Sequence, residues 1–87
     1  MKIKDGFILR EVASNYIVVA VNKAVKEFNG VINLNETGAF LWKQLEVGAD
    51  EEKLVSALLS EYDVGEDLAR SDVKKFIKKL QEAKLVD

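Results

Sequence analysis

The chain changes from strands to helices within one stretch, LNETGAFLW at residues 34–42. Upstream of it apolar residues tend to alternate, and from Asn35 onward they recur about every 3.6 residues. Asn35 is a favourable N-cap, and Glu36 places a carboxylate in the first turn, where the helix dipole stabilises it. We therefore predict a helix from Asn35 to near Gly48. Its apolar face is formed by Ala39, Phe40, Leu41, Trp42 and Leu45.

Two residues of this stretch have a structural explanation rather than a chemical one. Glycine inside a helix costs about 1 kcal/mol relative to alanine, so we attribute Gly38 to close approach of the helix to a neighbouring strand. Trp42 is in register with Leu41 and Leu45 and is assigned to the core. The chain contains neither GxGxxG nor GxxxxGK[ST], so no phosphate-binding loop is predicted.

Three strands are predicted upstream of the stretch. Phe7 to Val12 and the β-branched run Ile17 to Val21 flank the turn-forming pair Ser14-Asn15, which indicates a hairpin. Val31 to Leu34 forms a short third strand. It begins at Gly30 or immediately after it, because Asn-Gly at residues 29–30 is a strong turn dipeptide.

Two further helices are predicted downstream. Asp50 caps a helix with apolar residues Leu54, Val55, Leu58, Leu59 and Tyr62. After a break at Asp63 to Gly65, a third helix runs from Glu66 or Leu68 to Lys84. Its apolar stripe consists of Val73, Phe76, Ile77 and Leu80, and the residues facing away from the stripe are Lys74, Lys75, Lys78 and Lys79.

This order of elements predicts an α+β fold, a winged helix-turn-helix-like layout with a three-stranded antiparallel sheet followed by three helices. The 87 residues contain no proline, no low-complexity linker and no internal repeat. Residues 1–87 are therefore expected to form a single domain. For a domain of this size we expect a free energy of unfolding on the order of 5 kcal/mol.

Composition excludes several classes of function. The chain has no cysteine and no histidine, which argues against zinc sites, Cys-His pairs and Ser-His-Asp triads. We predict no enzyme activity, no cofactor and no metal. The longest apolar stretch, Tyr16 to Val21, is far too short to cross a bilayer, and no signal-peptide-like run follows the N-terminus. The protein is therefore predicted to be cytoplasmic, with no membrane partner.

The charged clusters each have a simple explanation. The acidic clusters, Asp50-Glu51-Glu52 and Asp63 with Glu66-Asp67, lack the spacing of a calcium loop and are interpreted as helix caps and first-turn acids. For the four lysines of the third helix, three interpretations remain open: a solvated face, a nucleic-acid contact, or one wall of a site for an acidic peptide. The formal net charge of −2 weighs against nucleic acid.

The stretch Leu34 to Trp42 resembles the PqqD-like family, in which a similar series of leucine, asparagine, small residue, glycine, alanine and tryptophan enters the first helix. The resemblance covers nearly the whole chain, and the strands match in pattern. It continues through Glu61-Tyr62-Asp63-Val64 and Ser71-Asp72-Val73 with Phe76 and Leu80, to Lys84-Leu85-Val86. The sequence departs from the family at the four lysines and at a long polar link, Asn22 to Asn29.

The resemblance implies a recognition element for ribosomally made, post-translationally modified peptides. Such a domain binds the leader segment of a precursor peptide and presents it to a modifying enzyme, such as a radical SAM protein or a leader peptidase. The leader adds to the third strand and lies in a groove against the third helix. The matching positions are Val31, Ile32, Asn33, Leu34, Asp72, Val73, Phe76 and Lys79. The opposite flank, around Lys74, Ile77 and Lys78, is the alternative wall.

Two other hypotheses remain from the sequence. The first is a small winged-helix DNA-binding domain, in which lysines of the third helix contact the groove or the phosphates. The second is self-assembly through the edge of the third strand, because Val31 to Leu34 contains neither proline nor an inward-pointing charge to block pairing.

Overall fold

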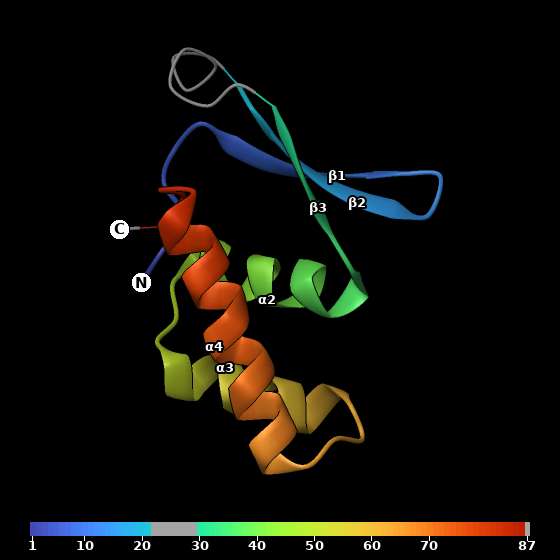
Figure 1. Ribbon diagram of the computed structural model, residues 1–87, viewed down its shortest axis with the longest axis vertical. Coiled ribbons are helices and arrows are strands. Elements are labelled where there is room, and N and C mark those ends of the chain that lie inside the picture. Colours follow the sequence, from blue (N-terminus) through green and yellow to red (C-terminus); the bar gives the residue numbers. More distant parts are fainter. Residues whose placement is uncertain (22–29, 87) are drawn as a thin grey trace.

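The computed structural model describes residues 1–21 and 30–86 (Figure 1). The predicted polar link, Asn22 to Asn29, lies outside the described residues. The described elements are β1 (Phe7–Val12), β2 (Asn15–Ala20), β3 (Val31–Leu34), α2 (Glu36–Val47), α3 (Glu51–Glu61) and α4 (Glu66–Glu82). The strands form an antiparallel sheet in the order β1-β2-β3. The predicted α+β class, with a three-stranded sheet followed by helices, is confirmed.

The hairpin between β1 and β2 turns one residue earlier than predicted. Its two loop residues are Ala13 and Ser14, with φ of 50° and 70°, and Asn15 already pairs with Val12 as the first residue of β2. Positive φ at both central residues is the geometry whose twist matches that of the flanking strands. The prediction of Ser14-Asn15 as the turn was therefore wrong, because the twist of the strands decides which residues occupy the loop.

The two faces of the sheet have different environments, because side chains alternate along each strand. Val18 is fully buried, Leu34 is also buried, and Leu9 and Ile32 pack against the same core. The side chains on the opposite face of the sheet include Val31, which is 55% exposed. The sheet therefore contributes one face to the core, and α2 crosses beneath this sheet in Figure 1.

The helix starts follow the predicted caps. The Asn35 side chain accepts a hydrogen bond from the Gly38 N–H at 2.7 Å, and the Asp50 side chain accepts one from the Lys53 N–H at 2.7 Å. Each bond satisfies one of the N–H groups left unpaired at a helix start. Gly48 ends α2 as predicted.

The end of α4 differs from the prediction. The helix stops at Glu82 rather than Lys84, because Lys84 adopts a left-handed φ of 61° and the Leu85 N–H donates back to the Leu80 carbonyl at 2.9 Å. This turn buries Leu85 completely and brings Val86 into an antiparallel bridge with Ile3. The two ends of the chain thus lie side by side in Figure 1 and close one side of the core.

Trp42 lies at the centre of the core, as predicted. It is fully buried together with Leu45, Leu54 and Leu80. Its indole N–H finds no hydrogen-bond partner among the described residues. Burial of the ring must therefore outweigh the cost of this unpaired donor, about 1–3 kcal/mol.

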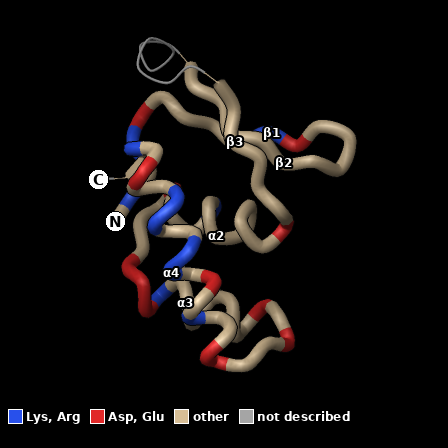
Figure 2. The backbone as a smooth tube through the Cα atoms, viewed as in Figure 1, with Lys and Arg blue, Asp and Glu red and all other residues tan. Residues whose placement is uncertain are grey.

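The longest described helix, α4, is amphipathic. Phe76, Ile77 and Leu80 face the core, and the lysines of this helix are exposed. Lys and Arg residues gather along its middle in Figure 2. The four lysines therefore lie on the solvent side of the helix, as the sequence predicts.

No helix in residues 1–21 and 30–86 combines the length and the apolar character that a bilayer crossing requires.

Candidate functional site

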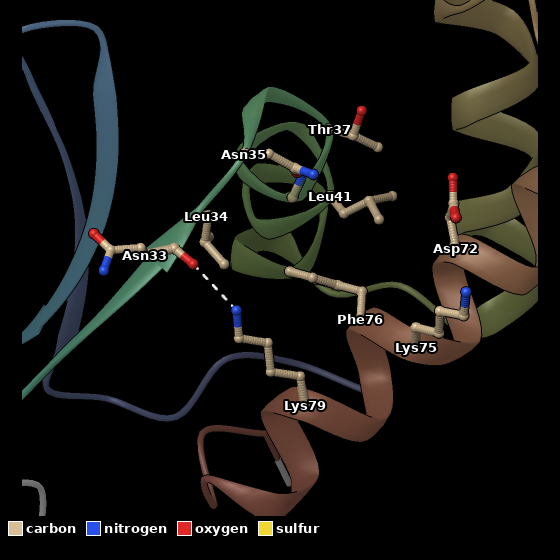
Figure 3. A pocket seen from close by; sticks show the side chains of 10 residues that line it. Asn33, Leu34, Asn35, Thr37, Leu41, Asp72, Lys75, Phe76 and Lys79 are labelled. Carbon is tan, nitrogen blue, oxygen red and sulfur yellow. Dashed lines mark hydrogen bonds between the residues drawn. The ribbon is translucent and has the colours of Figure 1, made fainter.

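A hollow of about 410 Å³ lies where β3 passes into α2, and α4 forms its opposite wall (Figure 3). The strand and the helix start contribute Asn33, Leu34, Asn35, Thr37, Gly38 and Leu41. The other wall consists of Asp72, Lys75, Phe76 and Lys79 from α4. Leu34, Leu41 and Phe76 are buried and make an apolar floor, whereas the charged side chains lie at the rim. The hollow thus combines an apolar base with a polar border.

Gly38 lies in the first turn of α2, at the base of the hollow and close to the end of β3. A Cβ atom at this position would lie 3.3 Å from the Leu34 Cβ and 3.2 Å from the capping oxygen of Asn35. Both distances are tighter than ordinary van der Waals contact, and neither atom is the free end of a long side chain. The prediction that Gly38 permits close approach of helix and strand is confirmed.

Gly38→Ala is accordingly expected to lower the free energy of unfolding by about 1 kcal/mol, because the crowding outweighs the gain in helix propensity. Urea unfolding of the free protein measures the change. Gly65→Ser is the matched control: a Cβ there meets nothing within 4 Å, φ is −76°, and serine is a good N-cap. An increase in stability for Gly38→Ala would contradict the packing argument.

The strand β3 lies at the edge of the sheet, since β2 is its one described strand neighbour. In a hairpin with a two-residue loop, the hydrogen-bonded pairs are the loop-flanking pair and every second pair beyond it. The Val21 N–H, which donates to the Gly6 carbonyl at 2.8 Å, continues that series from Val12 and Asn15. Tyr16 and the other even-numbered residues of β2 therefore direct their main-chain groups toward β3.

This alternation fixes which main-chain groups of β3 do not pair with β2. Leu34 and Ile32 lie opposite Tyr16 and Val18, so they pair with β2. The N–H and C=O groups of Val31 and Asn33 consequently point to the free edge of the sheet. This edge borders the hollow and faces α4, as the extended strand in Figure 3 shows.

A lysine bridges the hollow from α4 to this edge. The Lys79 Nζ donates a hydrogen bond to the Asn33 carbonyl at 3.1 Å, drawn as the dashed line in Figure 3. Lys75 lies one turn before Lys79 on α4, and Asp72 lies farther along the same wall, beyond Lys75. The hollow is lined by two ammonium groups and one carboxylate, which gives it a net positive charge of one.

The structure brings together five of the eight residues that the sequence predicts for peptide binding. These are Asn33, Leu34, Asp72, Phe76 and Lys79, all of which line the hollow. Val31 and Ile32 continue the same strand beyond it. Val73 has no exposed surface and packs in the core, so it supports the wall from behind.

The hollow also includes residues that the sequence reasoning missed. Lys75 was predicted only as one of four lysines that could form a wall for an acidic peptide, although residues 72, 75, 76 and 79 share one helix face at spacings of three and four. Thr37 and Leu41 had no such signal, since only the crossing of α2 and α4 places them there. The alternative flank does not line the hollow: Ile77 is buried, and Lys78 pairs with Glu82 at 4.0 Å.

Most of the remaining charge contacts tie α3 to α4, away from the hollow. The Arg70 guanidinium makes two hydrogen bonds to the Glu52 carboxylate, and this contact lowers the pKa of Glu52. Burial raises the pKa of Tyr62, whose ring meets Phe40 edge-on at 5.6 Å between centroids. The Arg70 contacts stabilise the packing of α4 against α3, so variants of Arg70 serve as controls remote from the hollow.

Comparisons with known proteins agree with the fold. A family model described as "Coenzyme PQQ synthesis protein D (PqqD)" matches residues 9–86. The solved structure "TbiB1 in Complex with the TbiA(beta) Leader Peptide" has a TM-score of 0.78 and 23% identity, covering 100% of this chain and 95% of that chain. "Lasso peptide synthetase B1 complexed with the leader peptide" has a TM-score of 0.74 and 18% identity, covering 97% and 93%. No curated protein sequence gives a significant match.

Proposed function

Because this chain belongs to the PqqD family, we propose that it is a single non-catalytic domain that binds the leader segment of a ribosomally made precursor peptide. One observation carries the proposal: the open edge of β3 borders a hollow with an apolar floor and a charged rim. Both similar structures are described as complexes with leader peptides. The leader adds as a fourth strand beside β3 and is presented to a modifying enzyme.

Strand addition explains how one site combines affinity with selectivity. An added strand lies about 4.8 Å from β3 and exchanges main-chain hydrogen bonds with Val31 and Asn33. Leader side chains opposite Ile32 and Leu34 point to the helix side of the sheet, because residues in register share a face. An apolar side chain opposite Leu34 therefore packs onto the floor formed with Leu41 and Phe76.

The chemistry of peptide modification belongs, in this proposal, to a partner enzyme. The chain has no histidine and no cysteine to act as base, nucleophile or soft metal ligand. A radical SAM protein or a leader peptidase is the class of partner we propose. The domain then contributes binding energy that holds the core of the precursor near the active site of that enzyme.

Isothermal titration calorimetry with leader peptides encoded beside the gene tests the function. We expect a one-to-one complex with an intact leader and no binding of a scrambled peptide with the same composition. A gel-shift titration at low salt tests the DNA-binding alternative, for which a steep loss of affinity with added salt is the signature. Absence of binding to every neighbouring leader, together with salt-sensitive DNA binding, would reverse the assignment.

Phe76→Ala is expected to weaken leader binding by about 2 kcal/mol, or about 30-fold, because the ring forms part of the floor. Phe76 is only 8% exposed, so the change also lowers the free energy of unfolding. Leu54→Ala is the matched control, since Leu54 is fully buried but does not line the hollow. Calorimetry well below both melting temperatures should show weak binding for the first variant and unchanged binding for the second.

A further inference from the structure

The bond from Lys79 to the Asn33 carbonyl occupies a group that an added strand needs. It joins residues 46 positions apart and, among the described residues, is the side-chain hydrogen bond that links α4 to the sheet. The Asn33 carbonyl points to the open edge, on the side where the new strand would lie. In the free protein the ammonium therefore stands in the path of the incoming peptide.

This contact also changes the interpretation of the strand edge. From the sequence, Val31 to Leu34 contains no device against pairing with another strand. The structure supplies that device from α4, because a lysine beside an edge strand discourages uncontrolled pairing. A peptide that binds at β3 must displace Lys79, and the displaced ammonium needs another partner.

The surroundings decide which partner is favoured. Lys75 lines the same hollow, and the charged residues that line it have a net charge of +1. A carboxylate forms a stronger hydrogen bond with an ammonium than a neutral carbonyl does. An acidic side chain on the leader therefore gains from both lysines, whereas a basic one is repelled.

On the basis of the leader-binding function above, we propose that Lys79 covers the β3 edge in the free protein and moves to an acidic side chain of the bound leader. Lys79 is thus a specificity-determining residue, and the substrate class is a leader with a carboxylate next to its apolar anchor.

The order of residues along the hollow gives the spacing. Figure 3 shows Phe76 beside Leu34, and Lys79 one turn farther along α4, reaching toward Asn33. The apolar anchor of the leader lies opposite Leu34, and the acid lies opposite Ile32 on the same face of the added strand. Side chains on one face of a strand are two residues apart. The leader should therefore carry its acid two residues from the anchor.

The test uses the neighbouring leader peptide that binds most tightly, with glutamate or glutamine at the position two residues from the anchor. Calorimetry compares both peptides on the wild type and on Lys79→Met, which retains the length of the side chain without its charge. We expect the wild type to prefer glutamate by about tenfold. Lys79→Met should lose most of this preference, keeping only the part due to Lys75, and should bind the glutamine peptide more tightly than the wild type does.

Lys75→Met is the matched control, because Lys75 lines the same hollow and has no hydrogen bond to β3. It should reduce the preference for glutamate without improving the binding of the glutamine peptide. If Lys79→Met weakened both peptides equally, or retained the full tenfold preference for glutamate, the role of Lys79 would be refuted while leader binding stood. If no leader bound the wild type, the proposed function itself would fall.

Discussion

Asn33→Pro is expected to abolish leader binding, with a loss of at least about 100-fold, while the free protein stays folded. The Asn33 N–H points to the open edge and takes no part in the ladder with β2, so proline there costs the sheet no hydrogen bond. In the complex the same substitution removes a donor to the leader and places the proline ring where the added strand must lie. The substitution thus separates the strand edge from the rest of the site.

Circular dichroism and calorimetry on the same sample measure both parts of this expectation. Val31 is the first residue of β3, and its N–H points to the open edge like that of Asn33. The variant Val31→Pro should therefore also fold and lose leader binding. Ile32→Pro is the opposite control, because its N–H pairs with β2 and its loss disrupts the sheet. Retention of leader affinity by a folded Asn33→Pro variant would exclude strand addition at β3.

Trp42→Ala is expected to leave the protein largely unfolded at 25 °C. Truncation of a fully buried tryptophan costs about 3–5 kcal/mol, which is comparable to the whole free energy of unfolding of a protein this small, on the order of 5 kcal/mol. The lost packing exceeds any gain from removing the unpaired indole N–H. Far-UV circular dichroism and urea unfolding measure the effect, since fluorescence is lost with the one tryptophan in the chain.

Val47→Ala on the same helix is the control for Trp42. Val47 is 77% exposed, so its truncation should change the free energy of unfolding by less than about 0.5 kcal/mol. A cooperative transition in Trp42→Ala within about 1 kcal/mol of the wild type would show that the ring is not the centre of the core.

The helix starts and the composition of the core were predictable from sequence because they depend on local chemistry. A cap acts within three residues, as Asn35 and Asp50 show, and a helical stripe repeats within two turns. Local rules were less accurate where the chain reverses. The loop at Ala13 and Ser14 follows the twist of two paired strands, and the turn at Lys84 follows the burial of Leu85.

The candidate site divides in the same way. The sequence by itself determined the third strand, the apolar stripe of α4 and the cap at Asn35, since each follows from alternation, helical spacing or a preferred residue type. Only the tertiary structure decided that Lys79 reaches the Asn33 carbonyl and that Thr37 and Leu41 line the same hollow. The physical reason is that these contacts depend on where α4 lies relative to β3 and α2. Long-range packing, rather than any local pattern, sets that placement.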